Sequence, residues 1–202
     1  MRNSKLTALA VAGVMAAASL VSCGQRNTES KTTETERPTQ ATNVYSQDYE
    51  IGAIEHKAEI SSEVEANDTG YTLNAVYTYD VKEENVKYVY LDVTVKNPTD
   101  VEYEISVLNN FYIQLTDGQE VYSSVRTQLF GISNFNNFFS DPFKIPANGE
   151  FNGIVGGFIV DPSVDTFTVG FFPTKDNERN KENVVLIDVT PDLIKDGTEL
   201  LK

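Results

Sequence analysis

The sequence predicts an all-β fold: a two-sheet antiparallel sandwich of the immunoglobulin-like type, preceded by a lipoprotein signal and a disordered tether. Three features of the sequence indicate this fold. One long stretch alternates between apolar and polar residues, turn signals recur at short intervals, and helical periodicity is almost absent. A chain of 202 residues with 40% hydrophobic residues is long enough for one domain with a substantial core.

The central strand is expected within Val86–Asp100, VKYVYLDVTVKNPTD. Asn97-Pro98 ends it, because proline cannot donate to a ladder and holds the preceding residue extended. Its two sides differ in polarity: Val89, Leu91, Val93 and Val95 fall on one side, and Tyr90, Asp92, Thr94 and Lys96 on the other. Since side chains alternate along a strand, we expect one face to be buried in the core and the other face to be partly exposed to solvent, as in an antiparallel sheet.

Seven short strands are expected besides the central one. They are Ala58–Glu65, Tyr71–Tyr79, Glu102–Val107, Phe111–Leu115, Phe151–Val160, Phe167–Phe171 and Val184–Val189. In Tyr71–Tyr79 the apolar face is Tyr71, Leu73, Ala75 and Tyr77. The first strand is ambiguous, because Ile51, Ile54 and Ala58 also fit a helical stripe.

Turn signals separate these strands. They are Asn67–Gly70, the polar loop Lys82–Asn85, Asp117-Gly118 as a two-residue type I′ hairpin, Pro146–Gly149 and Asp161-Pro162. Near the end, Thr190-Pro191 resembles an N-cap followed by a first helical position, which predicts one short helix closed by Gly197.

The N-terminal segment is expected to be an export signal. Arg2 and Lys5 precede an uncharged run, Leu6–Val21, that is shorter than the roughly 20 residues of a membrane-spanning helix. The following LVSC resembles the bacterial lipobox, and this resemblance assigns Cys23 as the lipidated first residue of the mature protein. The alternative is a lone cysteine after an ordinary signal. As the only cysteine, Cys23 has no partner for an intramolecular disulfide.

The expected organisation has four parts. Residues 1–22 are the lipoprotein signal, 23–48 a lipidated disordered tether, 49–192 the sandwich and 193–202 a short C-terminal helix or tail. The tether is rich in Thr, Glu and Gln, so it cannot bury enough apolar surface to offset its ordering entropy. At this length a flexible chain spans about 25–30 Å.

The charge of the chain restricts its partners. The formal net charge is −14, and removal of Arg2 and Lys5 with the signal takes it to −16. Such a surface repels nucleic acid and anionic lipid head groups, so we expect no nucleic-acid partner and anchoring at the cell membrane, facing outside the cytoplasm, through the Cys23 lipid alone.

The stretches YVYLDVTVKNPTD (Tyr88–Asp100), IPANGEFNGIVGGFIVDP (Ile145–Pro162) and TFTVGF (Thr166–Phe171) together resemble the DUF4352 family. The places of its motif are taken by Asn97, Pro146, Gly149, Gly153 and Phe158, although Ala147-Asn148 separates the proline and glycine that are usually adjacent. The resemblance covers roughly Ala58–Val189. It implies a secreted or lipid-anchored bacterial domain with a telokin-like, immunoglobulin-like sandwich, and it brings no catalytic residue.

Residues for catalysis are few, and we expect no enzyme, cofactor or metal. His56 is the only histidine, so no Ser-His, Cys-His or histidine-based zinc site can form, and we expect it on the surface. Gly153, Gly156 and Gly157 lack the following Lys-Ser/Thr of a phosphate loop and indicate a bulge or close sheet approach. The acid pairs Glu83-Glu84 and Asp161/Asp165 are read as solvated, with calcium as the alternative.

One stretch without a clean period, Leu129–Phe143, is expected to be a long functional loop. Its aromatic residues are Phe130, Phe135, Phe138, Phe139 and Phe143. Either they are exposed anchors for a partner or they close one end of the sandwich.

The sequence leaves three function classes open. The first is a non-enzymatic surface interaction module, with a protein partner in the envelope or outside the cell. The second is an accessory or inhibitor-like lipoprotein that docks on an envelope enzyme or transporter. The third, a solute-binding protein, would need two lobes, for which the domain is small.

Overall fold

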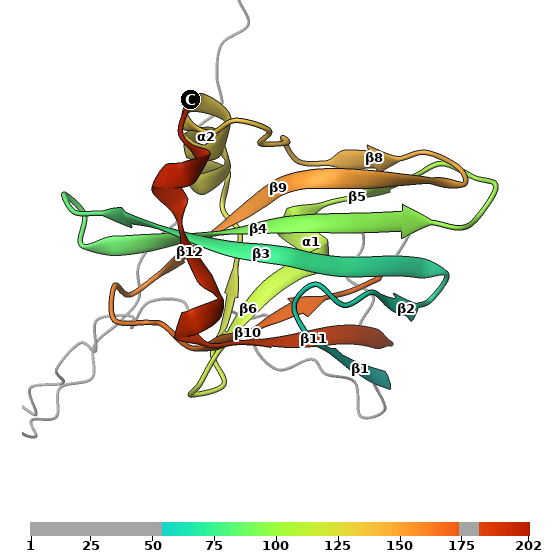
Figure 1. Cartoon of the computed structure of the whole chain (residues 1–202), viewed down its shortest axis with the longest axis horizontal. Coiled ribbons are helices and arrows are strands. Elements are labelled where there is room, and N and C mark those ends of the chain that lie inside the picture. Colours follow the sequence, from blue (N-terminus) through green and yellow to red (C-terminus); the bar gives the residue numbers. More distant parts are fainter. Residues whose placement is uncertain (1–53, 174–181) are drawn as a thin grey trace, which may run out of the picture. The chain divides into compact units, whose positions relative to one another are not determined.

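The computed structural model describes residues 54–173 and 182–202, and all of them belong to one compact unit. Two β-sheets face each other in these residues, which confirms the predicted sandwich (Figure 1). The expected signal, Cys23 and the tether lie outside the described residues.

The first sheet, sheet A, has five strands in the order β1, β11, β10, β6, β7. Their bounds are β1 Ile54–Ala58, β11 Asn183–Val189, β10 Phe167–Phe171, β6 Phe111–Leu115 and β7 Glu120–Tyr122. Neighbouring strands are antiparallel except at one edge, where β1 pairs in parallel with β11.

The second sheet, sheet B, has the order β12, β3, β4, β9, with β2 also paired to β3. The bounds are β12 Ile194–Asp196, β3 Thr69–Val81, β4 Val86–Asn97, β9 Gly149–Val160 and β2 Val64–Ala66. Here too one edge pair, β12 with β3, is parallel. A small third sheet joins β5 Tyr103–Ile105 to β8 Phe143–Ile145.

Helices connect and cover these sheets. They are α1 Val107–Asn110, α2 Val125–Asn134 and two 3₁₀ turns, Pro191–Leu193 and Gly197–Leu200. The expected closing helix after Thr190 is therefore wrong: the chain makes one 3₁₀ turn, adds β12 to sheet B, and Gly197 begins a second turn instead of ending a helix.

The central strand is β4, as predicted. Its apolar side, Val89, Leu91, Val93 and Val95, is fully buried in the core between the two sheets. Burying side chains of this size contributes about 1.5–3 kcal/mol each, so this side of β4 stabilises the sandwich strongly. On the opposite side, Asp92, Thr94 and Lys96 are partly exposed to solvent. Tyr88 and Tyr90 of the same side are instead buried in a second cluster.

A bulge in β3 overturns the face expected for this strand. Leu73 pairs with Val93, but the next residue in register is Ala75 opposite Asp92, so Asn74 is the extra residue. Tyr71 and Leu73 lie in the main core, and past the bulge Val76 takes the core side while Tyr77 packs in the second cluster. An inserted residue reverses the alternation, which a period-2 pattern does not reveal.

Two local predictions need correction. The expected first strand is split into β1 and β2 by a turn in which Ser61 has φ 65°. The β6–β7 hairpin exists, but its loop is not a two-residue type I′ turn: Gly118 N donates to Leu115 O (2.9 Å), Leu115 N to Gln119 O (2.8 Å), and only Gly118 has positive φ, +87°. This is a three-residue loop with a glycine bulge.

The other expected turns are confirmed. Asn67 and Asp68, with φ 48° and 52°, connect β2 to β3, and a turn closed by Gly149 N to Pro146 O (3.1 Å) precedes β9. At the end of β4, the buried Asn97 amide donates to three carbonyl oxygens, those of Val101, Ile145 and Pro146. Asn97 thus holds two turns together.

Candidate functional site

The segment expected to be a long loop begins with a helix. The Ser124 side chain accepts a hydrogen bond from Thr127 N (3.3 Å) and caps α2, which ends where Phe135 N donates to Gly131 O (2.9 Å). The loop prediction is therefore wrong for Leu129–Asn134. The helical period was missed because α2 is inverted: its buried side carries Thr127, Gln128 and Gly131, and most of its aliphatic residues point outward.

Beneath α2 lies an aromatic layer, formed by Phe130, Phe135 and Phe138 over Tyr79, Tyr88 and Tyr90 of sheet B. Ring centroids are 5.1 Å apart for Tyr79–Phe130, 4.7 Å for Tyr90–Phe135 and 5.8 Å for Tyr90–Phe138. The last two pairs are edge-on, a favoured arrangement for aromatic rings. The layer covers the outer face of sheet B and not an end of the sandwich, because Tyr88 and Tyr90 lie on the side of β4 opposite the core residues Val89 and Leu91.

The five predicted phenylalanines therefore separate. Phe135 is 1% exposed, and Phe143 lies in the main core, stacked on Phe151 at 4.0 Å. Phe130 and Phe138 are half-buried in the aromatic layer. Only Phe139, 42% exposed, presents a large part of its ring to solvent.

Hydrogen bonds latch α2 onto sheet B. The Tyr90 hydroxyl donates to Thr127 O (2.8 Å), and Thr127 Oγ1 donates to Gly157 O (2.6 Å); all of these groups are buried. These buried hydrogen bonds fix one orientation of the helix, because any other orientation would leave the same polar groups without a partner.

The glycines of β9 serve close contacts, as predicted for a bulge. Val89 pairs with Phe158 and Tyr90 with Gly156, so Gly157 is the extra residue, and Gly156 has φ +122°. A Cβ on Gly157 would come within 2.7 Å of the Tyr90 ring. The close neighbour is thus an aromatic ring on the outer face, not the other sheet.

The outward side of α2 is apolar. Val125, Leu129 and Ile132 are 63%, 57% and 41% exposed and follow one another at helical spacing. Leu201, 39% exposed, lies beside the end of the helix, where Lys202 N donates to Asn134 O (2.9 Å). We call Val125, Leu129, Ile132 and Leu201 the α2 outer face.

This face carries few charges in a strongly acidic protein, and Lys202 lies at its edge, where Nζ donates to Ile132 O (2.7 Å). From Val121 to Ser140 the only charged residue is Arg126, which is paired with Glu84. Acidic residues lie close by: Glu84 is held by that ion pair, and Glu199 is two residues from Leu201. Contiguous exposed apolar residues with a polar rim are typical of interaction surfaces.

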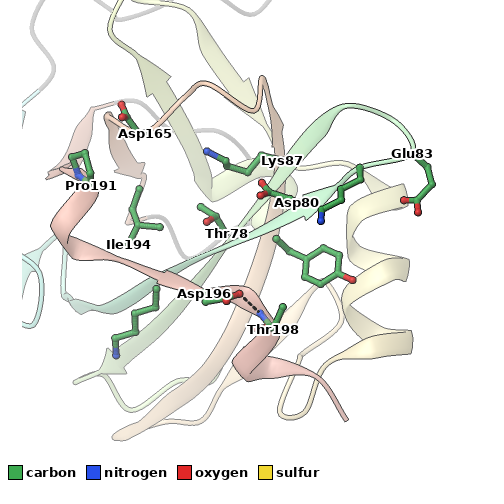
Figure 2. Close-up of a pocket in the computed structure, with 12 residues that line it drawn as sticks. Thr78, Asp80, Glu83, Lys87, Asp165, Pro191, Ile194, Asp196 and Thr198 are labelled. Atoms are coloured by element: carbon green, nitrogen blue, oxygen red, sulfur yellow. Dashed lines mark hydrogen bonds between the residues drawn. The ribbon is translucent and has the colours of Figure 1, made fainter.

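A charged groove of about 610 Å³ lies along the β3 side of sheet B. Its charged side chains are Asp80, Lys82, Glu83, Lys87, Asp165, Lys195 and Asp196. Figure 2 shows Asp165 and Glu83 toward opposite ends of the groove, with Lys87 and Asp80 between them. Lys87 Nζ donates to Val164 O (2.8 Å), and the hydrogen bond from Thr198 N (2.9 Å) lowers the pKa of Asp196. Because both signs of charge are interspersed, the groove selects neither an anion nor a cation.

The predicted acid pairs do not form a metal site in the described residues. Glu83 and Asp165 both line the charged groove, whereas Glu84 pairs with Arg126 and Asp161 accepts two bonds from Ser163, which lower its pKa. Within residues 54–173 and 182–202 no three His, Cys, Asp or Glu side chains gather closely enough to hold a metal ion.

His56 was expected on the surface as a solvated residue. It lies on β1, half-buried, with Nε2 3.0 Å from Asn183 Oδ1 on the adjacent strand β11.

In the described residues, no helix is both long and apolar enough to span a bilayer.

Sequence reasoning missed the α2 outer face, although signals for it exist. Ser124 with Thr127 resembles an N-cap, and Val125, Leu129 and Ile132 are spaced i, i+4, i+7. The phenylalanines in and after the helix obscured this spacing. Phe130 belongs to α2, Phe135 and Phe138 come after it, and all three pack beneath the helix.

Comparison with known proteins gives likenesses of fold only. No family model and no curated protein matches this chain, so the similarity to DUF4352 stays a resemblance. Among solved structures, the yjhA protein of Bacillus subtilis is 14% identical, covers 65% of this chain and 98% of its own, and has a TM-score of 0.45.

Two further structures are similar at the same level. A putative lipoprotein, ycdA of Bacillus subtilis, is 13% identical with a TM-score of 0.44, covering 64% of this chain and 38% of its own. The secreted protein MPT63 of Mycobacterium tuberculosis is 13% identical with a TM-score of 0.42, covering 67% and 98%. At this level the likenesses carry no argument about function.

Proposed function

We propose that this protein is a lipid-anchored, extracytoplasmic β-sandwich that acts as a non-enzymatic interaction module and binds a protein partner through the α2 outer face. The observation that carries the proposal is the run of exposed aliphatic residues on the outward side of α2, in a chain of net charge −14. Aliphatic residues exposed to water at helical spacing cost free energy that a partner recovers by covering them.

The occupant is a protein with an apolar contact surface in a basic surround. The net charge of −14 attracts such a partner over a distance. At the α2 outer face itself the charges are mixed, because Lys202 Nζ donates to Ile132 O (2.7 Å) and Arg126 pairs with Glu84. An anionic membrane surface would be repelled by the net charge, and a second copy would carry the same excess of negative charge.

Anchoring depends on Cys23. Two or three acyl chains on one cysteine, at about 0.8 kcal/mol per buried CH₂, hold a protein at the membrane, whereas the acidic chain has no basic cluster to assist. Cys23→Ala should move the protein from the detergent phase to the aqueous phase, or leave it held by an uncleaved signal. Mass spectrometry of the wild-type N-terminal peptide tests this directly, and an unmodified peptide that begins elsewhere contradicts it.

The partner surface is tested by site-specific photo-crosslinking in intact cells. A photoreactive amino acid replaces Leu129 in the full chain, and the control carries it at Val101, which is equally apolar and 65% exposed but distant from α2 in sequence. We expect a cross-linked protein from Leu129 and none from Val101, and we expect the product to diminish at high salt because salt screens the negative net charge of the chain.

The identity of the cross-linked protein separates the two function classes. A host or matrix protein supports the surface interaction module, and an integral membrane enzyme or transporter supports an accessory or inhibitor-like lipoprotein. Cross-links only to lipid, only to a second copy, or equally from both positions would contradict the proposed surface.

A further inference from the structure

A second, polar groove lies on the outer face of sheet B, beyond the end of the aromatic layer. Its volume is about 330 Å³, and its lining includes Tyr77, Asp92, Asn137, Phe139, Asn152 and Glu199. These come from β3, β4, β9, the segment after α2 and the last 3₁₀ turn, so segments far apart in the sequence form one site.

Two lining residues of this polar groove, Asp92 and Asn152, are positioned by hydrogen bonds within the protein. The extra residue of the β3 bulge, Asn74, donates through Nδ2 to Asp92 Oδ1 (3.1 Å) and to Thr94 Oγ1 (3.0 Å). From β9, Asn152 Nδ2 donates to the same Thr94 oxygen (2.7 Å). Because these bonds use the amide nitrogens, the Asn152 carbonyl oxygen and the second Asp92 oxygen are oriented acceptors.

One wall is an aromatic ring fixed by backbone contacts. Phe139 N donates to Ile154 O (3.0 Å), the ring packs edge-on against Phe151 at 4.9 Å, and it lies so close over Gly153 that a Cβ there would be 2.4 Å away. The ring nevertheless keeps 42% of its surface exposed. A rigid, partly exposed ring beside polar groups offers a stacking surface at little entropic cost.

The charge of the groove narrows the class of ligand. Asp92 and Glu199 are its acids, and no lysine or arginine of the described residues lines it, so an anion is repelled. The remaining polar groups are amides and a phenol, which both donate and accept. A ligand with hydroxyl groups matches these donors and acceptors, because a hydroxyl can donate to a carboxylate or carbonyl oxygen and can accept from an amide N–H.

We propose that the polar groove binds a neutral carbohydrate, with Asp92 and Asn152 bonding its hydroxyls and a C–H face of a sugar ring lying on Phe139. A volume of about 330 Å³ is at the low end for ligand sites and suits a short stretch of glycan. The observations behind this inference differ from those behind the α2 outer face, and none of its four residues lines the groove, although Glu199 lies near both.

The test uses the full chain in a phosphocholine detergent, because a maltoside detergent would compete as a sugar. Isothermal titration and ligand-observed NMR are carried out with β-1,4-linked tetramers of glucose and of N-acetylglucosamine. We expect one of them to bind with a dissociation constant of about 0.1–5 mM, the range for a shallow site that makes a few hydrogen bonds.

The variants are Asn152→Ala and Phe139→Ala, each expected to weaken binding at least about fivefold, the loss of one good contact. The matched control is Thr168→Ala on sheet A, which also removes one exposed strand hydrogen bond, that from Oγ1 to Asp188 Oδ1 (2.7 Å), and should bind unchanged. If Phe139→Ala unfolds, Asn152→Ala decides alone. No binding of either tetramer, equal binding by Asn152→Ala, or displacement of the glycan by spermidine as a preferred ligand would each overturn the proposal.

Discussion

The outer face of sheet B has two halves that differ in what covers them. Over Tyr79, Tyr88 and Tyr90 the face is closed by α2 and becomes a second core. Over Asp92 and Asn152 it is open and carries a network of polar side chains. The strands are the same, β3, β4 and β9, so the difference comes from side chains and not from the sheet.

This difference separates a stabilising half of the face from a half that is open to a ligand. The covered half is aromatic because the rings of Phe130, Phe135 and Phe138 pack there on the tyrosines of sheet B. The open half is free to hold polar groups, since bonds between side chains of neighbouring strands satisfy them. The stabilising cluster and the proposed ligand site thus occupy adjacent parts of one face.

The largest expected effect distinguishes the halves by stability. Phe135→Ala removes a ring that is 1% exposed and lies 5.6 Å from Phe130 and 4.7 Å from Tyr90, so the free energy of unfolding should fall by about 3–5 kcal/mol. Urea unfolding measures it. Phe139→Ala, in the open half, should cost about 1 kcal/mol. Equal losses would mean that Phe139 belongs to the core.

The sequence predicts the main core well because that core follows a simple period. Val89, Leu91, Val93 and Val95 alternate strictly, and each turn around them carries residues suited to it, such as Asn67-Asp68. The two-sheet sandwich follows from these local signals. Where the chain departs from the period, at Asn74 in β3 and at Gly157 in β9, pairing partners decide the register, and they are far away in sequence.

The candidate sites are less predictable for the same reason. Tyr88 and Tyr90 look like residues of a half-wet face until a helix from residues 125–134 covers them. That helix has polar residues inside, because Thr127 bonds to Gly157 O, so its pattern does not resemble an ordinary amphipathic helix. The polar groove requires five segments to meet, which no local pattern encodes.

A smaller effect is expected from the glycines beneath the two halves. In Gly157→Ala the new Cβ meets the buried Tyr90 ring at 2.7 Å and Val89 O at 3.0 Å, so unfolding should become easier by about 1–3 kcal/mol. In Gly153→Ala the Cβ meets the Phe139 ring at 2.4 Å, but this ring is 42% exposed, so displacing it breaks fewer buried contacts and the loss should be smaller. Thermal unfolding monitored by circular dichroism compares the two; a larger loss at Gly153 would reverse the assignment of the rigid half.

Two tyrosine hydroxyls give opposite expectations. Tyr90→Phe removes the bond to Thr127 O (2.8 Å) and should cost about 1 kcal/mol. Tyr71 in the main core is the described residue whose buried hydroxyl has no hydrogen-bond partner, so Tyr71→Phe should leave stability unchanged or raise it by about 1 kcal/mol. Chemical unfolding of both variants checks the sign, and a loss in Tyr71→Phe would show that this hydroxyl is satisfied in solution.

The smallest effect is expected on the outward side of the covering helix. Leu129→Gln exchanges a side chain that is 57% exposed for one of similar length and helix propensity, so the free energy of unfolding should change by less than about 0.5 kcal/mol. The same change removes apolar area from the α2 outer face, so it should reduce partner cross-linking from a probe at Ile132. The free energy of unfolding and the yield of cross-linked partner are measured on the same variant. Together they show whether Leu129 serves to cover sheet B or to bind a partner. A loss of more than about 1 kcal/mol would place Leu129 in the covering layer with Phe135, and α2 would then have no free apolar side to offer a partner.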